Sequence, residues 1–431
     1  MHQHRLIAVV AKSNFKKNNE AMAGALKQPY AIIAGLESMQ GLQAARILRQ
    51  RNVPVIAIVE DRNHFSCRTN CCEKIIEVEN GLANTLKILG PQLKERAVLF
   101  PCTDDYVLLI SRHRQILSQW YHIRLPNPNV VDIMIDKVKF YDFAIKNNFS
   151  IPRTFLLYSE DDLAKAVQGI AFPCVLKPHY RDTQWNANSS FKAFKVKNAE
   201  ELCSLYRKYR QWAGCLIAQE WIEGPDANLY SCNCYFDEKS RPLVTFVARK
   251  LRQWPPEAGQ SSLGEECRND LVLQETLRLF STAGFCGLGY LEMKRDDRTG
   301  GFFIVEPNIG RPTGRSAIAE AGGVELLYTM YCDAIGRPLP ANRQQQYGDV
   351  KWIHLRRDFQ SAFYYWLRGE LTSRQWLQSW RGRKTYALFS LKDPGPFLGD
   401  LARAVRLFLS KKERVKRDFT NPLLEKTGGR S

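Results

Sequence analysis

The sequence has no apolar run long enough to cross a membrane as a helix. Its longest runs, such as residues 30–36 and 284–291, fall well short of the roughly 20 residues that a membrane-spanning helix needs. The apolar segment near the start, residues 6–11, is shorter than the core of about 7 to 15 residues of a secretory signal peptide. We therefore expect a cytoplasmic protein.

Cysteine pairs at metal-binding spacings are lacking too. The chain has 12 cysteines, but neither Cys71-Cys72 nor Cys232-x-Cys234 has a second pair at the spacing of a tetrahedral zinc site. A disulfide framework is not expected in so long a chain without a signal peptide. We expect reduced thiols that pack as small hydrophobic side chains.

Acidic residues are too few to balance the basic ones. The 62 Lys and Arg residues against 44 Asp and Glu leave a formal charge of +18. Such a surplus attracts polyanions, so the candidate partners are nucleic acid, an anionic membrane and an acidic substrate. Nucleic acid is disfavoured because no recognised binding fold or aromatic stacking motif accompanies the charge.

Much of the basic surplus lies near the end of the chain. Between residues 401 and 418, two acids face the basic residues Arg403, Arg406, Lys411, Lys412, Arg414, Lys416 and Arg417. Apolar residues recur there at helical spacing, namely Leu401, Val405, Phe408 and Leu409. Two interpretations stay open: an amphipathic helix on an anionic membrane, at its inner face, or a solvated helix packed on the protein.

The hydrophobic pattern predicts α/β and α+β structure in successive parts of the chain. Residues 1–28 read as a polar leader. Apolar runs at 30–35 and 53–60 flank a helical stripe at 39–50, which is a β-α-β unit with a parallel sheet. With further strands at 75–78 and 97–101, residues 29–128 are predicted to form a small doubly wound domain. No G-x-G-x-x-G loop is present, so we assign it no dinucleotide.

The middle of the chain, residues 129–340, mixes antiparallel strands with flanking helices, which predicts an α+β domain. Helices are expected at 139–147, 199–212 and 271–283, and strands at 173–177 and 215–221 and in the region up to 250. Residues 341–431 form a C-terminal extension that ends in the helical basic tail.

The most informative segment is a predicted hairpin in residues 289–308. Asp297-Arg-Thr-Gly-Gly301 has the composition of a turn between two β-rich runs. A turn centred near Thr299 places Glu292 opposite Glu306, where like charges destabilise a sheet. Asn308 projects from the same face as Glu306.

Two carboxylates and an amide oxygen are ligands that suit magnesium. The alternative is a solvent-facing hairpin in which Lys294 or an arginine neutralises the pair. It stays open because a register slip of one residue sends these side chains to the other face.

Glu292-x13-Glu306-x-Asn308 resembles the metal-binding end of ATP-grasp ligases, and other segments follow in the order of that family. Asp136-Lys137 at a helix start resembles the first nucleotide-contacting lysine, and residues 172–177 resemble the strand that delivers the second, Lys177. Residues 216–226 resemble the hinge that holds adenosine. The resemblance covers roughly residues 30 to 340 and implies an ATP-grasp fold for 129–340 after a pre-ATP-grasp domain.

The resemblance also implies cofactors and site residues. ATP and Mg²⁺ are expected, with Mn²⁺ as an alternative metal. The implied metal ligands are Glu292, Glu306 and Asn308, and the implied nucleotide contacts are Lys137, Lys177, Gln219, Glu220, Ile222, Asp226 and Lys250. A structural role for Lys250 stays open.

Two arginines, Arg311 and Arg315, are the predicted catalytic residues, because a guanidinium can bind a phosphoryl group or a substrate carboxylate through a planar fork of donors. Family members usually carry one arginine two residues after the asparagine. This chain has Gly310 there, so which arginine takes the role stays open.

The implied activity is that of a carboxylate-amine ligase. ATP phosphorylates a carboxylate, an amine attacks the acyl phosphate, and ADP and phosphate leave. The identity of these small-molecule substrates and the oligomeric state are left open. One departure favours an alternative: residues 179–192, the loop that covers the phosphates in related enzymes, contain no glycine. The alternative is a catalytically weakened nucleotide-binding scaffold at an anionic membrane surface.

Overall fold

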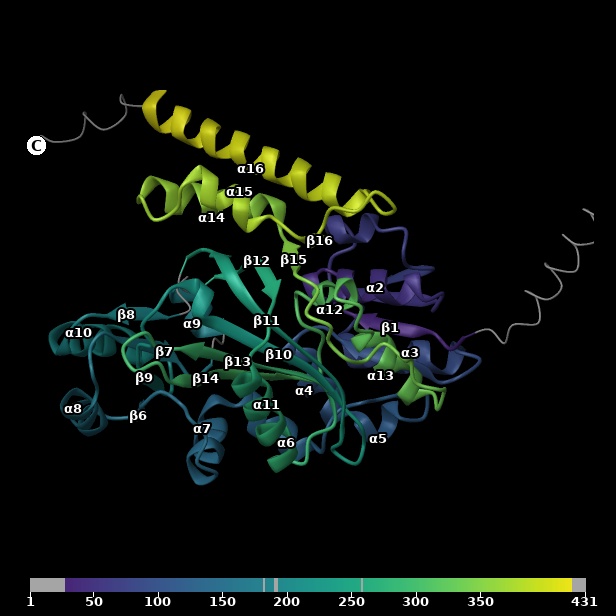
Figure 1. The fold of residues 1–431 in the computed structure, drawn as a ribbon, viewed down its shortest axis with the longest axis horizontal. Coiled ribbons are helices and arrows are strands. Elements are labelled where there is room, and N and C mark those ends of the chain that lie inside the picture. Colours follow the sequence, from purple (N-terminus) through teal and green to yellow (C-terminus); the bar gives the residue numbers. More distant parts are fainter. Residues whose placement is uncertain (1–27, 181–182, 190–192, 257–258, 421–431) are drawn as a thin grey trace, which may run out of the picture.

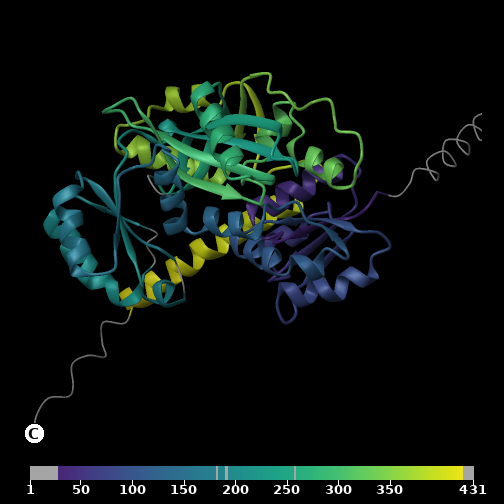
Figure 2. The ribbon, with the colours of Figure 1, turned by 90° about the horizontal axis from the view of Figure 1, so that it is seen from below.

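The described part of the chain is built on three sheets (Figure 1). The computed structural model describes residues 28–180, 183–189, 193–256 and 259–420. Nearly all of the predicted leader, part of the glycine-free loop and the end of the basic tail therefore lie outside the described residues. Figure 2 shows the N-terminal sheet and a small four-stranded sheet at opposite ends, with the large sheet between them.

The N-terminal domain is the predicted doubly wound unit. Its five strands are all parallel, in the order β3-β2-β1-β4-β5. They are β1 (Ala31–Ala34), β2 (Val55–Val59), β3 (Lys74–Glu77), β4 (Ala97–Pro101) and β5 (Tyr121–His122). The helices are α2 (Met39–Gln50), α3 (Leu82–Leu89), α4 (Asp104–Arg112) and α5 (Arg114–Leu117).

The central strands β1 and β2 are continuous apolar runs because both faces of the sheet are covered. The helices α2 and α4 begin just after β1 and β4, with N-caps at Ser38 and Thr103. Both N-termini therefore meet at one edge of the sheet.

The second sheet is four-stranded and antiparallel, in the order β6-β9-β7-β8. Its strands are β6 (Thr154–Leu157), β7 (Cys174–Pro178), β8 (Phe194–Val196) and β9 (Leu216–Glu220). Its helices are α8 (Glu160–Gly169), α9 (Thr183–Asn188) and α10 (Ala199–Tyr209), and α6 (Pro128–Ile135) and α7 (Lys137–Lys146) precede it. The predicted strands 173–177 and 215–221 are confirmed within one or two residues, whereas β6 and α8 were not predicted.

The third sheet has seven strands in the order β14-β13-β10-β11-β12-β15-β16. They are β10 (Leu229–Phe236), β11 (Pro242–Trp254), β12 (Gln260–Glu266), β13 (Gly287–Arg295), β14 (Phe302–Ile309), β15 (Val350–Ile353) and β16 (Arg383–Tyr386). Helices α11 (Asp270–Thr282), α12 (Ala317–Ala321) and α13 (Leu326–Ala334) accompany it.

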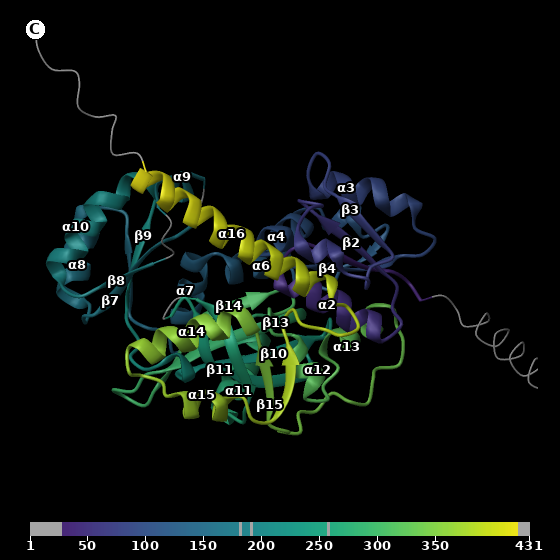
Figure 3. The ribbon, with the colours of Figure 1, turned by 90° about the horizontal axis from the view of Figure 1, so that it is seen from above.

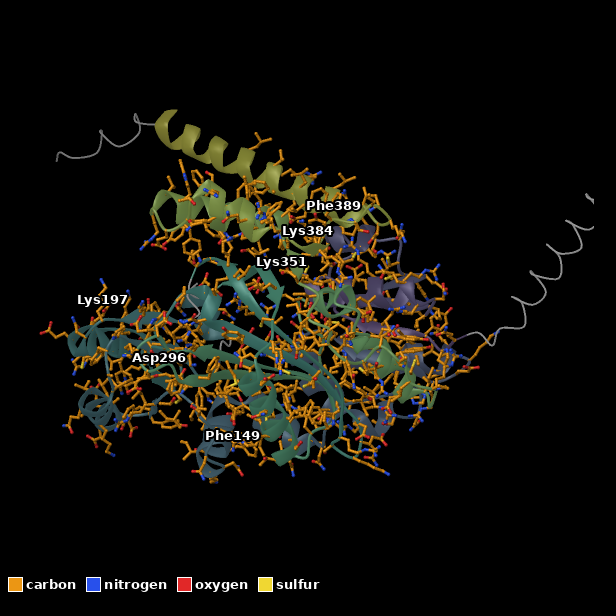
Figure 4. The ribbon with its side chains drawn as sticks, viewed as in Figure 1. Phe149, Lys197, Asp296, Lys351, Lys384 and Phe389 are labelled. Atoms are coloured by element: carbon orange, nitrogen blue, oxygen red, sulfur yellow. The ribbon has the colours of Figure 1, made fainter. Side chains whose placement is uncertain are left out.

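The large sheet continues across residue 340, where the sequence suggested a domain boundary. Strands β15 and β16 pair in parallel, with Lys351 in register with Lys384, and Figure 4 labels both side chains. Such a pair of like charges is tolerated because Lys351 forms ion pairs with Glu265 and with Asp349. The extension is thus structurally continuous with the middle of the chain.

The rest of the extension is helical: α14 (Leu355–Leu367), α15 (Ser373–Ser379) and α16 (Gly395–Thr420). Just before α16, Asp393 accepts hydrogen bonds from Arg46 and Thr69 of the N-terminal domain, at 2.8 and 2.7 Å. Figure 3 shows α16 running from beside α2 toward α9. The extension therefore contacts the N-terminal domain at Asp393, and its last helix runs from there toward the four-stranded sheet.

The predicted helical tail is confirmed as part of α16. Among the described residues, no helix is both long enough and apolar enough to cross a bilayer. The 12 cysteines are buried or half-buried, which fits the prediction that they pack as small hydrophobic side chains.

Candidate active site

The hairpin has the predicted register at its acidic pair. Strands β13 and β14 are antiparallel, with Glu292 opposite Glu306 and Tyr290 opposite Asn308. A bulge follows directly, between Glu292 and Met293. The register shift therefore lies between Glu292 and the turn. It does not separate Glu292 from Glu306.

The two carboxylates are neutralised unequally. Glu292 Oε1 lies 3.6 Å from Lys250 Nζ and 4.0 Å from Arg315 Nη2. Glu306 forms no hydrogen bond or ion pair with any described residue, although it lines a large cavity that solvent reaches. Desolvation by the surrounding cavity walls, and then the nearby charge of Glu292, raise the pKa of Glu306. The pair thus leaves one carboxylate available to a cation.

Lys294, which the sequence offered as a neutralising residue, points elsewhere. Its Nζ lies 5.0 Å from the centre of the Trp221 ring. The cations at Glu292 come instead from β11 and from the segment after β14.

Arg311 joins the hairpin to the N-terminal domain. Its Nε donates to Asp104 at 2.5 Å, Nη1 to the Tyr290 hydroxyl at 2.9 Å and Nη2 to the Asn308 amide oxygen at 2.5 Å. The Asn308 Nδ2 is buried without a partner among the described residues. Arg311 therefore orients the predicted metal-ligating amide, and it still lines the cavity.

The shift of this arginine by one position has a steric reason. Gly310 has a φ of +70°, and a Cβ there would lie 2.5 Å from Leu125 and 2.9 Å from Val107. No larger residue fits that position without displacing two buried side chains.

Arg315 and Lys250 line neither the cavity that contains Glu306 nor the cavity that contains Asp226. Their exposed fractions are 4% and 8%. Arg315 donates to the hydroxyls of Ser231, at 2.8 Å, and Ser261, and burial lowers its pKa. Both cations therefore contact Glu292 from the buried side and fix the position of its carboxylate. This is the structural role that the sequence left open for Lys250.

The two predicted phosphate-binding lysines share a cavity with Glu306. This first cavity has a volume of about 1000 Å³, and its lining includes Lys137, Lys177, Glu306, Asn308 and Arg311. Lysines from α7 and β7 thus converge on the hairpin as the sequence predicted.

Polar partners hold both lysines in place. Lys177 Nζ donates to the Tyr141 hydroxyl at 3.0 Å and to Gln219 Oε1 at 2.9 Å. Lys137 Nζ donates to the His179 carbonyl at 3.0 Å. Lys177 forms no ion pair with a described carboxylate, so its charge stays available for an anion.

The predicted adenosine-binding residues do not line this first cavity. Gln219 is buried against Lys177 and Thr154, Glu220 accepts from the Ala171 N–H at 3.4 Å, and Ile222 is half-buried. Asp226 lines a second cavity of about 660 Å³. The hinge therefore contributes Asp226, the predicted ribose-binding acid, to the second cavity and not to the first.

The extension supplies a partner of Asp226 that sequence reasoning missed. Asp226 accepts hydrogen bonds from Gln253 Nε2 at 2.7 Å and from the Tyr365 hydroxyl of α14 at 2.6 Å. Sequence reasoning also missed Tyr141 and Tyr290. A tyrosine on a separate element has no fixed sequence spacing from the other residues of the site, so no motif indicates it.

The described part of the glycine-free loop is organised around a tryptophan. Its middle forms α9, and Trp185 is fully buried, packed near Tyr209 with ring centres 5.5 Å apart. Residues 181–182 and 190–192 lie outside the described residues. The described part of the loop is thus tied to the core of the four-stranded sheet.

This arrangement suits one hard cation and a polyanion. No group of three His, Cys, Asp or Glu side chains that could hold a metal occurs among the described residues. A cation at Glu292 and Glu306 therefore needs oxygens from Asn308, water or a ligand, which is the usual coordination of magnesium with phosphates. The lysines on the same cavity would meet the remaining phosphate charge.

The three-sheet architecture with this hairpin is the ATP-grasp fold. Among solved structures, the chain resembles the biotin carboxylase domain of Hydrogenobacter thermophilus 2-oxoglutarate carboxylase, in complex with MgADP, with a TM-score of 0.58 and 12% identity, covering 73% of this chain and 71% of that one. It also resembles Staphylococcus aureus N5-carboxyaminoimidazole synthetase complexed with ADP, with a TM-score of 0.58 and 13% identity, covering 73% and 79%.

Curated relatives resemble the chain over part of its length. A D-aspartate ligase of Enterococcus faecium is 26% identical over 234 residues, 52% of this chain and 55% of the relative. A D-alanine–D-alanine ligase of Pseudomonas entomophila is 24% identical over 170 residues, 36% and 48%. The chain thus spans about half the length of the curated relatives it matches. No family model matches it.

Proposed function

We propose that the chain is an ATP-dependent ligase that joins a carboxylate to an amine through an acyl phosphate. The observation that carries this proposal is the unpaired carboxylate of Glu306, which faces Glu292 and shares one cavity with Lys137 and Lys177. Mg²⁺ bound with ATP supplies charge neutralisation for the phosphoryl groups. In this proposal Glu292, Glu306 and Asn308 hold the metal, and the two lysines hold the phosphates.

The remaining predicted residues take supporting roles in the proposal. Arg311 orients Asn308 through Nη2 and lines the cavity that would hold the phosphoryl groups. Lys250 and Arg315 position Glu292. The backbone from Glu220 to Ile222 would hold adenine, and the carboxylate of Asp226, on the second cavity, would hold the ribose.

The names of the relatives suggest where to look for the substrates. Because the chain resembles a D-aspartate ligase and a D-alanine–D-alanine ligase, we propose that an amino acid is one substrate, with D-aspartate as the first candidate.

ADP release measured over a panel of amino acids and amines tests the proposal. We expect release that needs both a carboxylate and an amine, and a Lys177→Met variant with nucleotide affinity about 10- to 100-fold weaker, because a charge-assisted hydrogen bond contributes about 1.5–3 kcal/mol. Lys197→Met, on the exposed surface of the same subdomain, is the control. Wild-type affinity in Lys177→Met, or no ADP release with any pair, contradicts the proposal.

We also propose a second role, attachment of the ligase to an anionic membrane surface. On α14, four large apolar side chains lie on one helical face with exposed fractions of 54–64%: Phe359, Phe363, Trp366 and Leu367. On α16, Leu401 and Val405 are about half exposed. Exposed basic residues accompany them, namely Arg368, Arg374, Arg381 and Arg403, a combination typical of helices that bind anionic lipid.

Vesicle sedimentation tests the attachment. Wild type is expected to bind vesicles that contain phosphatidylglycerol and to stay in solution with phosphatidylcholine alone. A Phe363→Ser, Trp366→Ser double variant should lose at least ~10-fold in affinity, because each buried aromatic contributes about 1.5–3 kcal/mol. The control Ile145→Ser removes an exposed apolar residue from α7. Equal binding by wild type and the double variant excludes α14 as the contact.

A further inference from the structure

One end of the first cavity is built by the C-terminal extension and carries an excess of cations. Its lining includes His354, Arg356 and Arg357 from the start of α14 and Asp400 and Arg403 from α16. Figure 3 shows that α14 and α16 lie on the same side of the molecule. These side chains come from elements other than α7 and β7, which deliver the predicted phosphate-binding lysines.

The charges at this end do not cancel. Arg356 forms a bidentate pair with Asp400, with both N···O distances 2.9 Å. Arg357 donates to Gln260 Oε1 at 2.5 Å but forms no ion pair with a described carboxylate. Arg403 stands 5.9 Å from the Phe65 ring centre and also has no described carboxylate as a partner. Two guanidinium groups therefore face the cavity without a counter-ion.

No acid elsewhere on the described cavity wall forms an ion pair with Arg357 or Arg403. Glu37 lines the cavity from the N-terminus of α2, but its Oε1 accepts hydrogen bonds from the backbone N–H of Asp61, at 3.0 Å, and of Glu60. Burial and the neighbouring Arg356 lower the pKa of Arg357, which means that the protein holds this cation at an energetic cost. A guanidinium group that is partly desolvated and has no carboxylate partner is characteristic of a site that binds an anionic ligand.

A buried histidine adds a neutral hydrogen-bonding group. His354 is 3% exposed and lines the cavity. Burial and then Arg357 lower its pKa to about 3, so its ring is uncharged at neutral pH. His354 is also the N-cap of α14, and its side chain does not cap the helix. The first N–H groups of α14 thus add to the positive potential between Arg356 and Arg357.

We propose that this end of the cavity binds an anionic group of the substrate, so that the ligase acts on a molecule with an acidic group beyond the reacting carboxylate or amine. This inference rests on the proposed function. A side-chain carboxylate and a phosphate share the required chemistry, since both accept hydrogen bonds from a guanidinium fork. The cavity volume of about 1000 Å³ accommodates such a substrate beside the nucleotide phosphates.

Substrate preference and an arginine variant test the inference. With the full chain, we expect ADP release to show a KM about 10- to 100-fold lower for aspartate, glutamate or phosphoserine than for alanine or glutamine. Preference for phosphoserine assigns the subsite to a phosphate, and preference for aspartate or glutamate assigns it to a carboxylate. Equal KM values for acidic and neutral amino acids overturn the inference.

The variant Arg357→Gln should raise the KM for the acidic substrate about 10- to 100-fold and leave the KM for ATP within about threefold. Arg381→Gln, an exposed arginine outside both cavities, is the matched control. Arg403→Gln repeats the test at an exposed position if Arg357→Gln fails to fold. A KM for ATP that rises in the same proportion assigns the arginine to the nucleotide and overturns the inference.

Calorimetric binding of the preferred acidic amino acid separates the two proposals. Binding that Arg357→Gln abolishes, without ADP release from any substrate, supports the anionic subsite and contradicts ligase activity. ADP release from neutral amino acids alone supports ligase activity and overturns the subsite.

Discussion

The Glu306→Gln variant is expected to release ADP roughly 100- to 1,000-fold more slowly than wild type, the range for losing one preorganised electrostatic contact with the transition state. In wild type, Glu306 is the carboxylate without a described partner and faces Glu292 across the hairpin. Glutamine keeps the shape of the side chain and removes the charge that a cation requires.

The same variant should be more stable than wild type without nucleotide. Burial and Glu292 raise the pKa of Glu306 above its ordinary value of 4.5, so the unfolded chain releases this proton at lower pH than the folded protein. Ionisation therefore costs stability as the pH rises above about 4.5. The gain from Glu306→Gln should be absent below that pH, where both states are protonated, and present at pH 7.

Thermal unfolding at several pH values, with and without MgADP, measures this difference. MgADP should stabilise wild type more than the variant, because ligand that binds only the folded state raises its stability. Glu95→Gln, which replaces an exposed acid of the N-terminal domain, is the control and should change neither property. Wild-type rates in Glu306→Gln would show that the hairpin is not the metal site.

The Asp358→Ala variant is expected to lose about 3–5 kcal/mol of unfolding free energy, the usual cost of breaking a buried ion pair from one side. Asp358 is fully buried in α14. It accepts from Arg252 Nε and Nη2 at 2.9 and 3.0 Å, and from the indole N–H groups of Trp376 and Trp380 at 3.0 and 2.7 Å. Removing the carboxylate leaves a buried guanidinium and two indole donors without their acceptor.

Urea unfolding measures this loss, with Asp161→Ala, an exposed acid of α8, as the control. The effect bears on function because α14 carries Tyr365, which contacts Asp226, and Arg357, which lines the first cavity. A loss under about 1 kcal/mol would mean that α14 is held to the large sheet mainly by its apolar contacts.

Local features of the sequence were sufficient for the parts of the fold that depend on near neighbours in the chain. The helix at 39–50 has the predicted bounds, because its apolar stripe and the Ser38 cap are local. The parallel N-terminal sheet follows from alternating strands and helices. The opposition of Glu292 and Glu306 follows from turn composition and strand alternation, which act over a few residues.

Tertiary packing decided which partners the charged residues of the site contact. Nothing in the spacing of the sequence indicates that Lys250 and Arg315 stand behind Glu292, or that Arg311 is held by Asp104 of another domain. Such contacts join segments far apart in the chain, and local patterns do not specify which segments meet. The sequence pattern also suggested a domain boundary at 340, although β15 and β16 extend the large sheet. Local patterns do not show that β15 pairs with β12, or β16 with β15.

The sequence by itself therefore determined the class of fold, the acidic hairpin and the two lysines that share its cavity. Only the tertiary structure decided which carboxylate is left for a cation, that Asp226 belongs to a second cavity, and that the extension supplies arginines to the first. Periodicity and turn composition act along the chain, whereas charge neutralisation and cavity walls depend on which distant side chains packing brings together.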